Sequence, residues 1–388
     1  MHFGKTVFTQ VMNGIHPEQF RRCVARYDGN YKVRNFSCWE QFLAMSFAQM
    51  TFRESLADIE ICLRSRGRQL YHLGFRSTVA HSTLADANGA RDWRIYADLA
   101  QVLIGRARTL YANEPLGVEL EHTIYALDST TVDLCLSLFP WARFRSTKAA
   151  VKLHTLLDVR GPIPTMITIS EGKQADVRIL DELFIEPGAF YVMDRGYVDF
   201  ARLYRFVLEA AFFVTRTKAG IQLNRLESRP VDRSTGLRSD HIVWLVNAQS
   251  VANYPDRLRR VSYRDPEDGK VLVFLTNNFD LPALVIAQLY KLRWRVELFF
   301  KWIKQNLRIK HFFGTSDNAV KTQVWIAVCV YVLVAILRKE LRLELSLSQM
   351  LQILSVNVFE QVSLVEVFAQ TASQIEPSEL PNQLMLFN

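Results

Sequence analysis

Two aspartates are placed where they could bind a catalytic cation together. Asp128 follows the apolar run at residues 123–127, and Asp194 follows a similar run at residues 189–193. Each carboxylate is therefore expected at the end of a short buried strand. A carboxylate in that position is costly unless a cation compensates its charge. If the two strands are neighbours in one sheet, the two aspartates lie close together at its edge.

A third carboxylate, Glu297, lies in a segment that is predicted to be helical. Residues 290–304 contain no Pro or Gly, and their apolar residues recur at three- and four-residue steps. On a helical wheel the polar residues share one face. That face carries Tyr290, Arg293, Glu297, Lys301, Lys304 and Arg308. A solvated face is the simpler interpretation of such a stripe, and the two aspartates are what favour a functional one.

Three carboxylates of this kind fit a magnesium or manganese site. Hard oxygen ligands that leave coordination positions open suit these ions, and the lack of an adjacent His/Cys cluster disfavours zinc. Two such ions can polarise a phosphodiester, generate the nucleophile and stabilise the leaving oxygen. Taken singly, Asp128 and Asp194 could instead be ordinary turn residues. The nearest competitors, which fit a buried strand end less well, are Asp133, Asp158, Asp176, Asp181 and Asp199.

The composition is compatible with a polyanionic partner such as nucleic acid, and it excludes few other classes of protein. Forty-seven Lys and Arg against 39 Asp and Glu give a net charge of +8 and a pI near 9.2. The five cysteines are scattered without CxxC spacing, which favours reduced thiols in a cytosolic protein. No apolar signal core follows Met1, and the apolar run at residues 324–337 falls short of the roughly 20 residues of a membrane helix. We expect a cytoplasmic protein without a membrane partner.

Residues 1–115 are expected to form an all-α DNA-binding domain. Segments 51–63 and 77–89 predict two helices that resemble a helix-turn-helix pair, with arginines between and after them. The alternative is a plain helical hairpin with a solvated basic surface.

The rest of the chain predicts an α/β fold with a mixed sheet flanked by helices. Residues 116–216 give the order β-β-β-α-β-α-β, an antiparallel meander followed by crossovers. Residues 217–280 predict a β-rich insertion without a helix of its own. Residues 281–320 contain the Glu-bearing helix, 321–369 a helical C-terminal region, and 370–388 a flexible tail.

Three motifs resemble those of the DDE transposases of cut-and-paste bacterial insertion sequences, the family marked by a Tyr-Arg-Glu-Lys signature. They are Asp128 in YALDSTTV, Asp194 in YVMDRGYVDF, and Tyr290-x2-Arg293-x3-Glu297-x6-Lys304. The resemblance covers essentially the whole chain. It implies an RNase H-like catalytic core with two Mg²⁺ ions, for which Mn²⁺ can substitute. It also implies hydrolysis at each transposon end, hairpin formation by the freed 3′-OH, and strand transfer into target DNA.

The resemblance also implies roles for single residues. The implied metal ligands and catalytic residues are Asp128, Asp194 and Glu297. The residues implied to hold the terminal DNA phosphate are Tyr290, Arg293 and Lys304, with Lys301 on the same predicted face. The implied partners are double-stranded DNA, as terminal inverted repeats and target, and a second copy of the chain in the synaptic complex. The implied location is the bacterial cytoplasm, at the nucleoid when the protein is bound to DNA.

Two further segments have weaker signals. Trp244, in the insertion, could stack on an unpaired base beside the hairpin, as an insertion-domain Trp does in relatives, although a core tryptophan is commoner. The terminal peptide resembles the motif by which bacterial proteins dock on the replicative sliding clamp; its residues are Gln383, Leu384, Leu386 and Phe387. The alternative is a terminal peptide that packs on its own domain.

Two other functions compete with a transposase. An RNase H-like nuclease or resolvase would share the metal chemistry without strand transfer, but it leaves Tyr290, Arg293 and Lys304 unexplained. A non-catalytic, DNA-binding transposase relic would not need an intact set of three carboxylates.

Overall fold

The chain divides into two compact units that are interleaved in sequence. The computed structural model describes residues 4–118, 120–145, 148–306 and 312–372. One unit comprises Met1–Leu110 and Lys301–Asn388, and the other comprises Tyr111–Phe300. The proposed clamp-binding residues Gln383, Leu384, Leu386 and Phe387 and the predicted face residue Arg308 lie outside the described residues.

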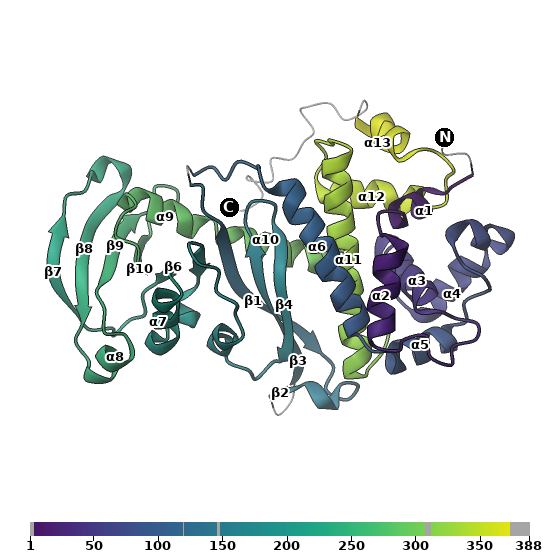
Figure 1. Ribbon diagram of the computed structural model, residues 1–388, viewed down its shortest axis with the longest axis horizontal. Helices are drawn as coiled ribbons and strands as arrows, with labels where there is room; N and C mark the ends of the chain where they lie inside the picture. Colours follow the sequence, from purple (N-terminus) through teal and green to yellow (C-terminus); the bar gives the residue numbers. More distant parts are fainter. Residues whose placement is uncertain (1–3, 119, 146–147, 307–311, 373–388) are drawn as a thin grey trace. The chain divides into compact units, whose positions relative to one another are not determined.

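The described part of the first unit is helical (Figure 1). Its elements are α1 Val7–Met12, α2 Pro17–Arg26, α3 Cys38–Met50, α4 Leu56–Arg64, the 3-10 helix η1 Gly67–Leu73, α5 His81–Ala90, α6 Arg94–Tyr111, α11 Asp317–Glu340, α12 Leu347–Asn357 and α13 Leu364–Ala372. Helix α11 packs against α3, α5 and α12. By length and composition α11 could cross a membrane, but 94% of its most apolar window is buried inside the protein. It is the core helix of this unit, and it is longer than the apolar run in the sequence.

Helices α4 and α5 form where the sequence predicts the helix-turn-helix-like pair. Ser55 caps α4 by accepting a hydrogen bond from the Asp58 backbone N–H at 3.0 Å. Glu60 connects the two helices, since its carboxylate accepts hydrogen bonds from the Arg64 guanidinium and from the His81 backbone N–H at 2.9 Å. The 3-10 helix η1 lies between them in the chain, so the connection is longer than a simple turn. DNA binding by this pair stays a prediction.

The described residues of the second unit form a ten-stranded mixed sheet. The strands are β1 Ile124–Leu134, β2 Arg143–Arg145, β3 Lys148–Asp158, β4 Ile163–Glu171, β5 Phe190–Met193, β6 Phe212–Arg216, β7 Leu223–Arg229, β8 Leu237–Leu245, β9 Leu258–Arg264 and β10 Val271–Thr276. Their order is β2-β3-β1-β5-β6-β10-β9-β8-β7, and β4 pairs with β3. Strands β1, β3 and β4 are antiparallel, whereas β1, β5 and β6 run parallel. This is the meander with crossovers predicted for an RNase H-like core.

Helical segments cover both faces of this sheet. They are η2 Pro140–Ala142, η3 Asp176–Asp181, η4 Arg195–Tyr197, α7 Phe200–Leu208, η5 Arg233–Thr235, α8 Ala248–Asn253, α9 Ala283–Lys291 and α10 Trp294–Asn306. On one face Leu127 and Met193 pack with Leu203 and Phe206 of α7. On the other face the Tyr290 ring of α9 lies 4.8 Å from that of Phe274. The functional residues follow this second face.

Several predicted boundaries were wrong. The first of the two helices predicted within residues 116–216 is only a six-residue 3-10 helix, η3. The insertion contains the short helices η5 and α8, although no helix was predicted there. Helix α8 is too short to show a helical period, and its signal is a cap: the Asn247 side chain accepts from the backbone N–H groups of Gln249 and Ser250.

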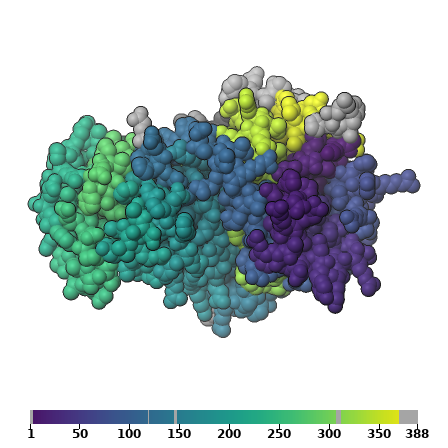
Figure 2. All heavy atoms as spheres, in the orientation of Figure 1, coloured from purple at the N-terminus to yellow at the C-terminus, as the bar shows by residue number. Residues whose placement is uncertain are grey.

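The insertion continues the main sheet. Strand β10 pairs with β6, and β9, β8 and β7 follow outward from it. Strand β7 pairs only with β8 among the described strands, and its side chains are largely exposed (Figure 2). The insertion is therefore connected to the core through backbone hydrogen bonds as well as through its two chain connections.

A buried ion pair joins the insertion to the segment before α9. The Arg259 guanidinium donates to both carboxylate oxygens of Asp240, at 2.9 and 2.8 Å, and the two side chains are 2% and 4% exposed. The same guanidinium donates to the carbonyl oxygen of Leu281 at 2.6 Å. Strands β8 and β9 are thus tied to the start of α9.

Replacement of Arg259 is expected to destabilise the protein strongly. Arg259→Ala leaves the Asp240 carboxylate buried without a counter-ion, which costs about 3–5 kcal/mol. The matched control is Lys270→Ala, because the Lys270–Asp268 pair at 2.7 Å is exposed and contributes less than about 1 kcal/mol. Chemical denaturation of both variants measures the difference. Equal free energies of unfolding would contradict this prediction.

Candidate active site

The pairing of β1 with β5 brings the two predicted aspartates together. In the parallel register Leu127 lies opposite Met193, so Asp128 and Asp194 are the next residues on adjacent strands and share a face. The condition for the two aspartates to lie close together, that their strands are neighbours in one sheet, is met. The prediction that Asp128 ends its strand was wrong, because β1 continues to Leu134 in pairing with β3. Asp194 does follow its strand directly and caps η4.

Arg293 connects the sheet to Glu297. Its guanidinium donates to Asp128 Oδ2 at 2.6 Å and to Glu297 Oε1 at 2.5 Å. Glu297 is only 33% exposed in its side chain and is directed toward the Asp128 side of the sheet through this shared partner. The predicted proximity of Arg293 and Glu297, four residues apart, is confirmed.

The prediction of one continuous helix through these residues was wrong. Helix α9 ends at Lys291 and α10 begins at Trp294. Between them the backbone N–H groups of Leu292 and Arg293 bond to carbonyls three residues back, which tightens the chain into a turn. No Pro or Gly marks this break in the sequence. The turn is the place from which Arg293 contacts both carboxylates.

Burial raises the pKa of Asp128 to about 6. Arg293 opposes that rise, as does the backbone N–H of Ser129, and the carboxylates of Glu297 and Asp194 add to it. A carboxylate 2.6 Å from a guanidinium usually has a lowered pKa. Here Arg293 is shared with Glu297, so its charge does not offset both the burial and the neighbouring carboxylates. The cluster has more negative charge than its one contacting arginine neutralises.

Tyr290 lies beside this cluster and is 7% exposed. The centre of the Arg293 guanidinium is 5.7 Å from the centre of its ring. Burial raises the pKa of Tyr290; Arg293 and Arg216 lower it, and Asp194 raises it further. The Tyr290 hydroxyl is therefore within electrostatic reach of Arg293, Arg216 and Asp194.

Three of the predicted DNA-binding residues lie farther from the carboxylates. Lys301 and Lys304 follow Glu297 along α10, about one and two turns on. Trp244 is half-buried on β8, four strands from β5 in the sheet order, which separates it from Asp194 by roughly 19 Å across the sheet. Stacking of Trp244 on a displaced base stays a prediction.

The carboxylates fit divalent cations by chemistry, although in this arrangement Arg293 lies between two of them. Asp128, Asp194 and Glu297 supply hard oxygen ligands, and the raised pKa of Asp128 reflects a site that a cation would stabilise. Within the described ranges, no three His, Cys, Asp or Glu side chains are gathered closely enough to hold a metal ion. Arg293 engages one oxygen of each of two carboxylates, Oδ2 of Asp128 and Oε1 of Glu297, so a cation at these two residues would compete with it.

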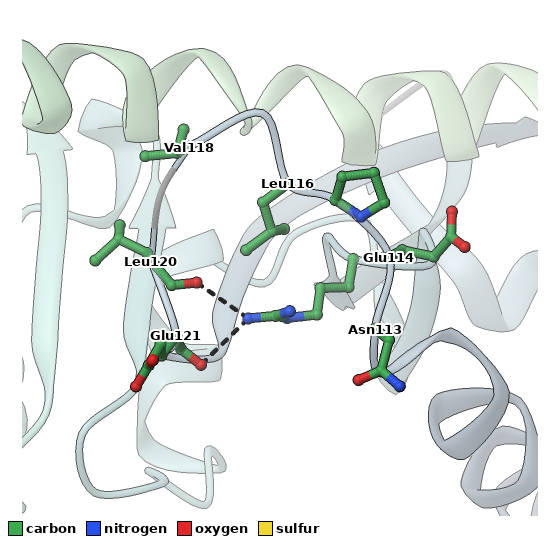
Figure 3. A pocket seen from close by; sticks show the side chains of 8 residues that line it. Asn113, Glu114, Leu116, Val118, Leu120 and Glu121 are labelled. Atoms are coloured by element: carbon green, nitrogen blue, oxygen red, sulfur yellow. Dashed lines mark hydrogen bonds between the residues drawn. The ribbon is translucent and has the colours of Figure 1, made fainter.

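A separate open cavity of about 460 Å³ lies elsewhere in the same unit (Figure 3). It is lined by Asn113, Glu114, Pro115, Leu116, Val118, Leu120, Glu121 and Arg160. Arg160 donates to the carbonyl oxygens of Leu120 and Glu121 at 3.1 and 3.2 Å. The proposed catalytic carboxylates are not among its lining residues, and Arg160 is already bonded to the backbone.

Arg216 was missed in the sequence. It ends β6, which is parallel to β5, and it follows Thr215, the partner of Met193. It therefore lies on the same face as Asp194, one strand farther along. The sequence does contain a signal for Arg216, because this residue follows an apolar run just as Asp128 and Asp194 do.

Comparisons with known proteins point to one family. A family model described as "Transposase DDE domain" matches residues 119–333, and a "Domain of unknown function" matches residues 3–76. The chain is 32% identical over 257 residues to a Sinorhizobium fredii protein named as transposase y4zB, covering 65% of this chain and 70% of that one. It is 34% identical over 209 residues to a Geobacillus stearothermophilus protein named as the transposase of IS5377, covering 53% and 54%. A cryo-EM structure of the piggyBac transposase synaptic complex with hairpin DNA aligns with a TM-score of 0.44 at 11% identity, over 96% and 84%.

The raised pKa of Asp128 predicts a specific dependence of stability on pH. The folded protein keeps this proton up to about pH 6, whereas the unfolded chain loses it near its ordinary pKa. The stabilisation from the proton is therefore complete below pH 4 and is lost as pH rises through about 6. Between these pH values the wild type should lose up to about 3 kcal/mol relative to Asp128→Asn.

Denaturation of both proteins from pH 4 to pH 7 in chelator-treated buffer measures this difference. Parallel stability curves would show that the pKa of Asp128 is not raised.

Proposed function

The chain belongs to the transposase DDE domain family and is an enzyme that acts on DNA, and we propose that Asp128, Asp194 and Glu297 are its catalytic carboxylates. The reaction proposed is metal-dependent excision and integration of an insertion sequence. The observation that carries this proposal is the placement of Asp128 and Asp194 side by side on parallel strands, with Glu297 connected to Asp128 through Arg293.

The three carboxylates are the proposed ligands of two divalent cations, Mg²⁺ or Mn²⁺. Bound there, such cations would polarise the phosphodiester and stabilise the leaving oxygen. The protein contributes rigidity, because Asp128 lies in β1, Asp194 directly follows the paired strand β5, and Glu297 is connected to Asp128 through Arg293. Half-burial of the site limits the water that competes for the carboxylates and strengthens the electrostatic interactions within it.

Tyr290, Arg293 and Lys304 are proposed to hold the terminal DNA phosphate. Arg293 would exchange its two carboxylates for a phosphate when DNA binds, since a guanidinium presents the same fork of donors to either anion. Lys301 is proposed as a further DNA contact on α10. Tyr290 packs on Phe274, and this contact fixes the position of the ring next to Arg293.

We propose that cleavage passes through hairpin ends, in keeping with the Tyr-Arg-Glu-Lys signature. The test uses the purified full-length protein, Mg²⁺ and linear DNA that carries the inverted repeats of the element. Hairpin ends and integration products support this pathway, whereas nicks without joining would indicate a nuclease. A shifted but uncut DNA would indicate a non-catalytic binder. Paired ends would also require a dimer, which cross-linking of the complex can detect.

Single substitutions of the carboxylates should separate binding from cleavage. Asp128→Ala, Asp194→Ala and Glu297→Ala are each expected to slow cleavage by more than about 100-fold, because each removes a ligand that stabilises transition-state charge. Affinity for uncut DNA should be retained. Asp133→Ala is the matched control, as Asp133 is an exposed aspartate on the same strand as Asp128. Cleavage at the wild-type rate by any of the three variants would remove that residue from the assignment.

The terminal peptide is proposed to dock on the bacterial sliding clamp. Leu386 and Phe387 would enter an apolar groove on the clamp, and the polar segment before them would present the peptide in extended form. Pull-down with purified clamp should retain the full chain and lose a chain truncated after Pro381. Leu386→Ala combined with Phe387→Ala is a milder version of the same change. Equal retention of the full and truncated chains would end this proposal.

A further inference from the structure

Three parallel strands bring two carboxylates and one guanidinium into a single row. Leu127, Met193 and Thr215 are opposite one another in β1, β5 and β6. The next residue on each strand is Asp128, Asp194 and Arg216 respectively. Residues in register on adjacent strands project from the same face, so the row continues from the proposed metal ligands to Arg216. Neighbouring strands place each step about 4.8 Å apart.

Within the described part of the chain, Arg216 has no partner for its charge. It is half-buried at the end of β6, yet among the described residues its guanidinium has no hydrogen bond or ion pair, even with neighbouring Asp194. Several other arginines of this unit that are at least partly buried donate to oxygens: Arg259 to Asp240, Arg293 to Asp128 and Glu297, and Arg295 to the Val159 and Leu116 carbonyls. Half-buried Arg260 resembles Arg216 in having no side-chain hydrogen bond or ion pair among the described residues, but it lies on β9, away from the row of proposed metal ligands. A guanidinium that is partly desolvated and unpaired has five donors available to an external acceptor.

The surroundings of Arg216 favour an anion that approaches the catalytic face. Across the antiparallel pair it lies opposite Phe274, whose ring packs against Tyr290. The charges of Arg216, Arg293 and Asp194 all affect the Tyr290 hydroxyl, so both arginines are within electrostatic reach of it. A DNA strand brought to these carboxylates needs cations to offset its phosphates. Arg293 can supply one such charge only by leaving its carboxylates, whereas Arg216 is already unpaired.

We propose that Arg216 binds a backbone phosphate of the DNA strand in the active site, on the β6 side of Asp194. This inference rests on the proposed function. The guanidinium fork fits two phosphate oxygens. Arg216 and Arg293 then act at different places: Arg293 belongs to the turn between α9 and α10 and contacts Asp128 and Glu297, and Arg216 extends the row beyond Asp194.

The test compares Arg216→Ala, Arg216→Lys and the control Arg233→Ala, which removes an exposed charge in η5. Binding to a short duplex bearing the inverted repeat is measured by fluorescence anisotropy in EDTA over a range of salt concentrations. Arg216→Ala should weaken binding by roughly ten-fold and reduce the salt slope by about one phosphate contact. Arg216→Lys should keep part of the affinity, and Arg233→Ala should bind as the wild type does.

A scan of neutral methylphosphonate substitutions identifies the phosphate and excludes a merely structural role. At the contacted position the wild type should lose affinity to the level of Arg216→Ala, and Arg216→Ala should lose nothing more. Wild-type affinity in Arg216→Ala would overturn the inference. So would losses that add at every phosphate position, because a damaged fold weakens all contacts alike. A wild-type protein that neither binds nor cuts the DNA would instead contradict the proposed function.

Discussion

The arrangement of this site depends on the parallel register of β1 and β5. A shift of one residue would move either aspartate to the opposite face, where Leu127 and Met193 pack into the core beneath α7. Apolar burial on that face therefore fixes the polar geometry on the other. The carboxylates do not need a special local structure, because the alternation of side chains along a strand determines their direction.

The charge of these carboxylates explains the contacts of Arg293. Asp128 is buried next to two other carboxylates, which raise its pKa together with the loss of solvent. Burial alone would lower the pKa of the Arg293 guanidinium, but Tyr290, Asp128 and Glu297 outweigh that effect and raise it. One cation shared between Asp128 and Glu297 is a stable arrangement for the protein by itself. The same two carboxylates have the chemistry of metal ligands, so a bound cation would compete with Arg293 for them.

Much of this arrangement could be predicted from the sequence, and the failures have physical causes. The succession of strands and helices along the chain, and the placement of Asp128 and Asp194 after two strands, followed from short apolar runs ended by polar residues. The extension of β1 to Leu134 was not predicted, because Asp128 and Ser129 interrupt the apolar run as turn residues do. The β-branched residues Thr130, Thr131 and Val132 that follow favour a strand, and pairing with β3 forms it. The turn between α9 and α10 could not be predicted, because the sequence there has good helix propensity and contains no Pro or Gly. Tertiary contacts of Arg293 override that propensity. Arg216 was not predicted, because a single arginine after an apolar strand has no spacing that distinguishes it from a solvated charge.

The insertion contributes to the site through the position of α9. Arg259 is held by Asp240 and donates to the carbonyl of Leu281, two residues before α9 begins at Ala283. Because α9 leads directly to Tyr290 and Arg293, the start of this helix determines where the turn meets Asp128. Strand β10 adds to this control, since Phe274 packs against Tyr290 and lies opposite Arg216. The β-rich insertion is therefore part of the framework that places the phosphate-binding candidates around the carboxylates.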